Sequence, residues 1–229
     1  MPRKTTAQKA CLSIDKAKAA ERVRKIWPVL VKTYPDAKIA LKYTNTLELL
    51  IATILSAQCT DVRVNMVTKD LFKKYKSLDS WIKADIKQIE ADIKSTGFYH
   101  NKAVNIKGAC TAIQNQYDGK VPDTMEELLK LPGVGRKTAN VVLGNAFGVP
   151  GIVCDTHVIR LSRRLGLSEN SDPVKLEFDL AEIVPKENWT LFSDLLIFHG
   201  RSICKARKPD CKNCLISKFC PAADSPDLW

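Results

Sequence analysis

The sequence lacks any long apolar run. Its 229 residues contain no stretch of about eighteen apolar residues, which is roughly the length that a helix needs to cross a bilayer. The first residues also lack the apolar core that marks a secretory signal. We therefore expect no membrane span and no secretion, and predict a cytoplasmic protein.

A second absence is the sustained alternation of apolar and polar residues that half-buried strands need. Apolar residues recur instead at helical spacing in short segments. We expect helices at residues 14–34, 47–56, 62–74, 78–84, 86–95, 102–117, 124–130, 138–146, 158–165, 173–184 and 189–200. The predicted fold class is all-α, with short loops between many short helices.

Acidic residues are few relative to basic ones. Asp and Glu number 25 against 36 Lys and Arg, which gives a formal net charge of +11. Such an excess favours a polyanionic partner, with nucleic acid first and an anionic membrane surface second. Residues 1–13 are polar and basic, and we predict a mobile tail there, either solvated or in loose contact with DNA.

The eight cysteines are unevenly distributed. Cys11, Cys59, Cys110 and Cys154 are scattered, whereas Cys204, Cys211, Cys214 and Cys220 are clustered. Without a secretion signal, clustered cysteines are typical of metal ligands rather than disulfides. Their spacing, C-x6-C-x2-C-x5-C, has one close pair and two outlying residues. This favours an iron–sulfur cluster over structural zinc, which more often uses two close pairs, and free thiols are the third alternative.

Three cations lie inside the cysteine cluster. Lys205, Arg207 and Lys208 fall between the first two cysteines of the set. A charged loop held at both ends by a metal site would suit contacts to a phosphate backbone. The alternative is an ordinary solvated loop.

The segment 131–135, Leu-Pro-Gly-Val-Gly, separates two predicted helices. Pro and Gly end the first helix, and the second Gly lets the chain turn before the next one. One interpretation of such a hairpin is an anion site, because its free amides point outward at the start of the second helix. A tight packing turn between the two helices accounts for the same sequence equally well. Arg136 and Lys137 then stand in the first helical turn, where each positive charge opposes the helix dipole by roughly 0.3–1 kcal/mol. A bound phosphate at Gly133 and Gly135 would remove that conflict.

Asp155 precedes a predicted helix. Asp is a favoured N-cap, and from position alone capping is the first interpretation. The second is a catalytic carboxylate facing Lys137, and the two roles are compatible. Gln58 stands at a helix junction, where by itself it reads as an ordinary polar linker residue.

Three motifs in order carry a family resemblance: the hairpin at residues 131–139, the Val-Cys-Asp-Thr-His segment at 153–157, and the four clustered cysteines. Together they resemble endonuclease III, a DNA glycosylase of the helix–hairpin–helix superfamily, over about residues 14–221. The resemblance implies two lobes with DNA across the groove between them. One is a six-helix bundle at 39–149, with the helix–hairpin–helix at about 124–146. The other, from 14–38 and 150–221, carries a [4Fe-4S] cluster, and 222–229 is a C-terminal tail.

The resemblance also implies roles for single residues. It places the cluster ligands at Cys204, Cys211, Cys214 and Cys220, the nucleophilic lysine at Lys137 and the catalytic aspartate at Asp155. Residues that fill the gap left by a flipped base correspond to Gln58 and to the loop of Gly97, Phe98 and Tyr99. Two positions depart from the family: Phe98 often has an aliphatic counterpart, and Cys59 stands where we expect Ala.

The implied function is a bifunctional glycosylase and abasic-site lyase of base excision repair, acting on oxidised pyrimidines in duplex DNA. We expect a monomer associated with the nucleoid. The adenine glycosylase branch of the superfamily lacks the lysine at position 137 and usually has a further C-terminal domain, so we expect the chain not to belong to it. A non-catalytic DNA-binding module with zinc would have no need for Lys137 and Asp155, and an electron-transfer protein leaves the hairpin and the charge unexplained.

Overall fold

The computed structural model of the protein describes residues 14–223. These residues form helices and loops and no strand. The α-helices are α1 (Lys16–Thr33), α2 (Thr46–Leu55), α3 (Asp61–Lys74), α4 (Leu78–Lys83), α5 (Ile86–Ile93), α6 (Tyr99–Gln116), α7 (Met125–Leu128), α8 (Arg136–Ala146), α9 (Thr156–Arg164), α10 (Pro173–Ile183) and α11 (Trp189–Ser202). Four 3-10 turns accompany them: η1 (Lys94–Thr96), η2 (Lys186–Asn188), η3 (Cys211–Asn213) and η4 (Ser217–Phe219). The all-α prediction is confirmed. The tail predicted at 1–13, with Cys11, and residues 224–229 of the tail predicted at 222–229 lie outside the described residues. Ala222, the first residue of that predicted C-terminal tail, is buried.

Short polar side chains fix where many of these helices begin. The side chain of Asn45 accepts a hydrogen bond from the Glu48 amide at the start of α2, and Thr60 does the same for α3. Asp172 accepts from two amides of α10. Each cap satisfies an amide that has no partner inside the helix.

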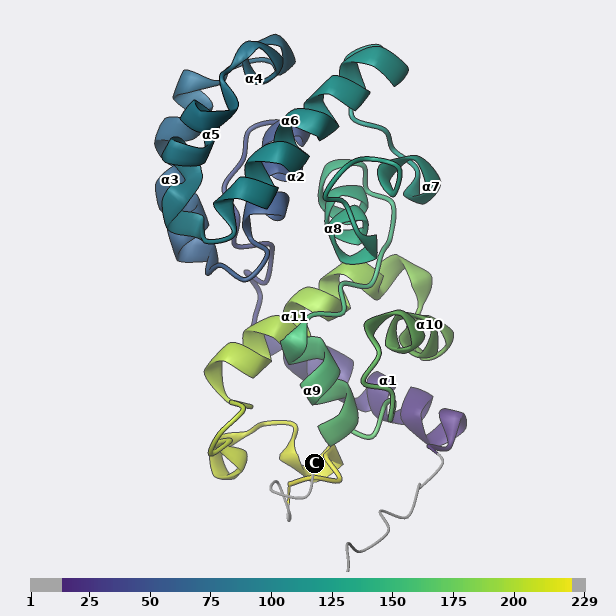
Figure 1. The fold of residues 1–229 in the computed structure, drawn as a ribbon. Coiled ribbons are helices and arrows are strands. Elements are labelled where there is room, and N and C mark those ends of the chain that lie inside the picture. Colours follow the sequence, from purple (N-terminus) through teal and green to yellow (C-terminus); the bar gives the residue numbers. More distant parts are fainter. Residues whose placement is uncertain (1–13, 224–229) are drawn as a thin grey trace, which may run out of the picture.

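Two hydrophobic clusters form the core, and they correspond to the two lobes in Figure 1. The first is built from α2 to α8. The second combines α1 with α9, α10 and α11, so it joins segments far apart in the sequence. Seven α-helices lie between residues 39 and 149, the shortest of them, α7, being 4 residues long. The exact boundaries predicted for the two domains stay predictions, supported by these clusters.

The segment Ile152–Cys154 passes between the lobes. Ile152 and Cys154 are buried in the second cluster, whereas Val153 is buried in the first. Alternate side chains of an extended segment point to opposite sides, so this short segment contributes buried side chains to both hydrophobic clusters. It therefore delivers the next residue, Asp155, to the junction of the lobes.

An ion pair also connects the lobes. Arg201 near the end of α11 donates to Asp61 at the start of α3, with an Nη2–Oδ2 distance of 2.7 Å. Over residues 14–223, the helices are too short or too polar to traverse a bilayer.

Candidate active site and cysteine pocket

The hairpin between α7 and α8 is anchored by its apolar residues. Leu131 and Val134 are buried, and the Val134 amide donates to the Leu131 carbonyl at 3.1 Å. Gly133 adopts a left-handed conformation, with φ of 76°. Gly135 is the N-cap of α8, and no side chain caps that helix. The exposed turn therefore presents free amides, as the phosphate-site interpretation requires.

The two glycines of the hairpin are needed for different reasons. A Cβ on Gly133 would lie 2.7 Å from Cβ of Asn105, whereas a Cβ on Gly135 would meet nothing within 4 Å. Gly133→Ala should therefore destabilise the fold by roughly 1–3 kcal/mol, through strain and a clash with α6. Gly135→Ala should change stability by less than about 1 kcal/mol, yet weaken duplex binding about tenfold if a phosphate approaches that amide.

Urea unfolding and fluorescence anisotropy with a labelled duplex measure the two effects separately. Unchanged duplex affinity for Gly135→Ala would contradict a phosphate site at the hairpin, and would leave the packing turn as its sole role.

Lys137 and Asp155 line one pocket, a cavity of about 90 Å³ at the junction of the lobes. Lys137 lies in the first turn of α8 and is exposed. Asp155 is half-buried at the start of α9. The structure thus brings together the two side chains that the sequence singles out, although 18 positions separate them.

Asp155 caps α9 with one carboxylate oxygen. Its Oδ1 accepts from the amides of His157 at 2.7 Å and Val158 at 2.8 Å. Among the described residues, no donor binds Oδ2. The capping interpretation is correct, and it leaves the second oxygen for chemistry in the pocket.

Arg136 is paired with a carboxylate of the second lobe. Its guanidinium binds the Glu177 carboxylate of α10 at 3.0 Å and 2.5 Å, and it lies over the Phe178 ring, 5.3 Å from the centroid. The hydrogen bond to Glu177 raises the pKa of Arg136. The charge of Arg136 is therefore balanced within the protein, whereas Lys137 forms no ion pair among the described residues. A DNA contact by Arg136 stays a prediction.

Sequence reasoning missed four charged residues of the same pocket: Lys38, Asp61, Asp194 and Arg201. Burial raises the pKa of Asp194 to about 6, and the Arg201 charge opposes that effect. Asp194 and Arg201 lie seven positions apart on α11, a spacing that returns to one face of a helix. The seven-residue spacing indicates that both side chains lie on one face of α11. It could not reveal that this face borders the pocket that contains Lys137.

Gln58 and Phe98 both have left-handed backbone conformations, with φ of 53° and 48°. Such values are uncommon for residues other than glycine, and they concentrate at functional sites. Both residues are exposed, Phe98 to 63%. Two strained, exposed residues in separate loops are suited to insertion into a DNA stack.

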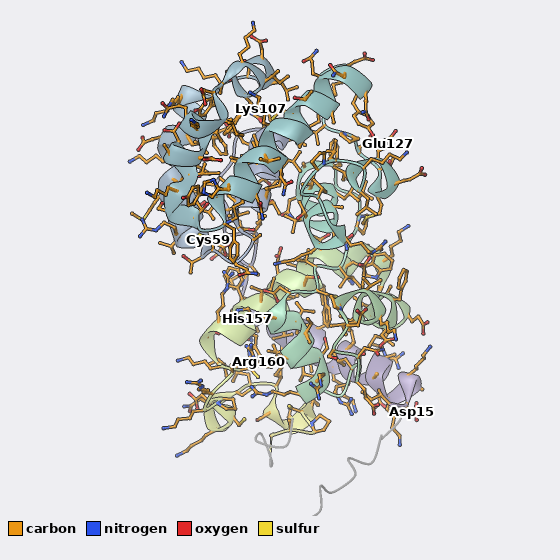
Figure 2. All side chains as sticks on the ribbon, viewed as in Figure 1. Asp15, Cys59, Lys107, Glu127, His157 and Arg160 are labelled. Atoms are coloured by element: carbon orange, nitrogen blue, oxygen red, sulfur yellow. The ribbon has the colours of Figure 1, made fainter. Side chains whose placement is uncertain are left out.

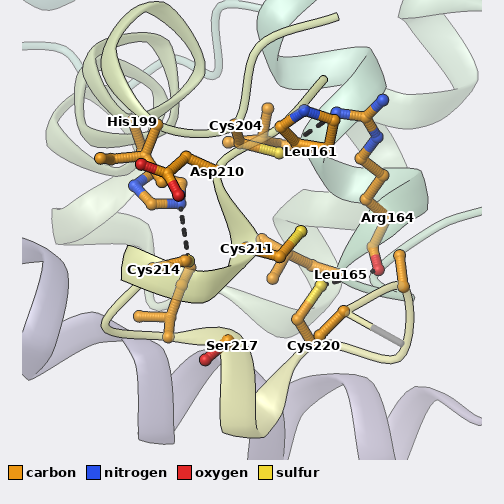
Figure 3. Close-up of a pocket in the computed structure, with 15 residues that line it drawn as sticks. Leu161, Arg164, Leu165, His199, Cys204, Asp210, Cys211, Cys214, Ser217 and Cys220 are labelled. Atoms are coloured by element: carbon orange, nitrogen blue, oxygen red, sulfur yellow. Dashed lines mark hydrogen bonds between the residues drawn. The ribbon is translucent and has the colours of Figure 1, made fainter. Parts of the chain in front are cut away.

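The four clustered cysteines line one pocket together with Arg164 and His199 (Figure 3). None of the four forms a disulfide. Burial raises the pKa of the Cys220 thiol to about 11. A bound metal would displace such protons, because thiolates are the ligand form. In donor chemistry the pocket fits either an iron–sulfur cluster or zinc.

In residues 14–223, no group of three or more Cys, His, Asp or Glu side chains is placed to hold a metal ion. The four cysteines nevertheless line one pocket, and the geometry does not choose between an iron–sulfur cluster and zinc.

Two arginines of α9 and one histidine of α11 support the cysteine loop, and sequence reasoning missed all three. Arg160 donates to the Cys204 carbonyl at 2.9 Å. Arg164 donates to the Lys205 carbonyl at 2.7 Å and to Cys204 Sγ at 3.4 Å. His199 Nε2 lies 3.4 Å from Cys214 Sγ (Figure 3). The four-residue spacing of the arginines was a signal, since it places both on one face of α9.

Lys205, Arg207 and Lys208 are exposed on the loop that follows Cys204. Among the described residues, none of the three forms an ion pair. Their charges are therefore available to a polyanion, while the solvated-loop alternative stays open.

Comparison with known proteins agrees with this geometry. Residues 51–186 match a family described as "HhH-GPD superfamily base excision DNA repair protein". Over 210 residues the chain is 50% identical to an endonuclease III of Synechocystis sp., a match that covers 91% of this chain and 96% of that protein.

Two solved structures have similar folds, each with a TM-score of 0.87 and 44% sequence identity. One is a non-covalent endonuclease III–DNA complex, and the similarity covers 92% of this chain and 99% of that one. The other is a trapped endonuclease III–DNA covalent intermediate, with coverage of 91% and 98%.

Proposed function

Because the chain belongs to the endonuclease III family of the HhH-GPD superfamily, we propose that it is a bifunctional DNA glycosylase and abasic-site lyase of base excision repair. Its substrate is duplex DNA that carries an oxidised pyrimidine. The observation that carries the proposal is the shared pocket of Lys137 and Asp155 beside the hairpin. A binding module would not need a lysine and a carboxylate in one pocket.

Binding begins with the phosphate backbone. The net charge of +11 attracts DNA at long range, and the uncapped start of α8 offers amides to a phosphate beside the lesion. The damaged nucleotide turns out of the stack at a cost of a few kcal/mol, which is smaller for a damaged base. Gln58 and Phe98 then fill the vacated space, as inserted side chains do in other DNA-bending proteins.

Lys137 is the nucleophile. Its neutral amine attacks C1′ of the sugar, the bond from C1′ to the base breaks, and the electron pair leaves with the base, which takes up a proton. Opening of the sugar ring then gives a Schiff base between C1′ and Nζ. Removal of a proton from C2′ expels the 3′ phosphate by β-elimination, which nicks the strand.

Asp155 stabilises positive charge that develops on the sugar and accepts a proton. The two amides that bind Oδ1 hold the carboxylate in place, so Oδ2 meets the reacting sugar at little reorganisation cost. Capping thus supports the chemistry by fixing the orientation of the group.

Cys204, Cys211, Cys214 and Cys220 are proposed ligands of a [4Fe-4S] cluster, which would hold the Lys205–Lys208 loop in a fixed position against the DNA backbone. The spacing of the cysteines along the chain, with one close pair and two outlying residues, supports a cluster with several irons over one zinc ion. The purified protein should therefore be yellow-brown and contain about four irons per chain. Cys214→Ser should lose most of the visible absorption. A colourless parent with about one zinc per chain would contradict this assignment.

The experiment that tests the proposed function is borohydride trapping on a duplex with one abasic site. A covalent protein–DNA band and a nick 3′ to the site support it. A duplex bound without band or nick would favour the binding module or a glycosylase that uses water. The preference for damaged pyrimidines, the monomeric state and the nucleoid-associated, cytoplasmic location stay predictions.

A further inference from the structure

Lys102 is a buried lysine without a carboxylate partner among the described residues. The residue is 4% exposed, and its Nζ donates to the carbonyls of Leu55 and Thr96, both at 2.8 Å. Burying an ammonium group is costly unless hydrogen bonds compensate for the lost water. Two backbone carbonyls supply that compensation here.

Each carbonyl ends a different segment. Leu55 is the last residue of α2 and Thr96 is the last residue of η1. A cation suits both positions, because carbonyls at the end of a helix lack partners within it. The chain then continues in each case to a strained, exposed residue: Gln58 lies three positions after Leu55, and Phe98 two positions after Thr96.

We propose that Lys102 is a positioning residue that holds the Gln58 loop (residues 56–60) and the Phe98 loop (residues 97–98) at one fixed spacing, so that both side chains enter the duplex together. The proposal rests on the proposed function, in which these two side chains fill the gap left by the flipped nucleotide.

The physical basis is preorganisation. Left-handed conformations such as those of Gln58 and Phe98 persist only where surrounding structure holds them, and loops ordered before binding do not lose that entropy on binding. Lys102 is itself fixed, since its amide donates to the Phe98 carbonyl at 3.1 Å. Burial lowers the pKa of Lys102, and its electrostatic interaction with Cys59 opposes that lowering. The ammonium of Lys102 therefore binds, from one buried point, the residue that precedes each loop.

The test compares Lys102→Met with Lys107→Met. Lys107 lies on the same helix, and its Nζ donates to one backbone carbonyl, that of Ala84, at 2.6 Å. Figure 2 shows Lys107 further along α6, away from Cys59 and the edge that faces the other lobe. The control therefore removes a similar lysine–carbonyl contact without touching either loop.

Borohydride trapping is measured on two substrates, an abasic duplex and an abasic single strand. The single strand has no gap to fill, so it reports the Lys137 chemistry alone. On the duplex, Lys102→Met should be trapped at least tenfold more slowly than the parent. On the single strand, its trapping rate should lie within twofold of that of the parent. Lys107→Met should stay within twofold on both. An equal loss on both substrates, or no loss on the duplex, would overturn the proposal.

A second readout requires binding only. A duplex with 2-aminopurine opposite a tetrahydrofuran abasic analogue should brighten when the parent inserts its side chains, and this change should be largely lost in Lys102→Met. If Lys102→Met does not fold, Lys102→Gln replaces it and should show the same separation between duplex and single strand to a smaller degree. A parent that never traps DNA would contradict the proposed function, whereas the fluorescence comparison would still decide the role of Lys102.

Discussion

Lys137→Gln is expected to abolish the covalent protein–DNA band on an abasic duplex, with a loss of strand nicking of at least about 10³-fold. The amide of Gln cannot form a Schiff base. Because Lys137 is exposed at the mouth of the pocket, the substitution should leave stability nearly unchanged. Gel analysis after borohydride reduction, together with urea unfolding, measures both quantities.

Lys130→Gln is the matched control. It removes the same charge from the same helix–hairpin–helix, but its amine pairs with Glu126 on the surface. It should trap DNA as the parent does. A band that persists in Lys137→Gln would mean that another amine is the nucleophile.

Asp155→Asn and Asp155→Ala should separate the two functions of this carboxylate. Asn keeps an oxygen that can accept from the His157 and Val158 amides, so the start of α9 should keep its cap. Ala removes it and should cost about 1 kcal/mol of stability in addition. Both variants lose the charge and should nick DNA about 10²–10⁴-fold more slowly.

The measurements are single-turnover nicking rates and the free energy of unfolding. Equal stability of Asn and Ala variants would show that the cap contributes little. A parent-like nicking rate in Asp155→Asn would exclude the negative charge as a requirement of the reaction.

Local features of the fold follow from the sequence because they depend on neighbours along the chain. The helix predicted at 62–74 is found at Asp61–Lys74, and the side chain of Thr60 caps its start. The hairpin turn at Gly133 and the cap by Asp155 were likewise predictable from residue type and order. The helix predicted at 102–117 instead begins at Tyr99, because Phe98 adopts a left-handed conformation that the sequence does not signal.

The amino-acid sequence by itself determined the helical class, the hairpin, the two candidate catalytic residues and the four candidate cysteine ligands. Only the tertiary structure decided which groups pair between segments distant in the sequence. Examples are Arg136 with Glu177, Arg201 with Asp61, and Lys102 with two backbone carbonyls. Helix periodicity and caps are set by residues within about four positions of one another. Pairings between helices depend on how two cores pack, and no local spacing encodes that.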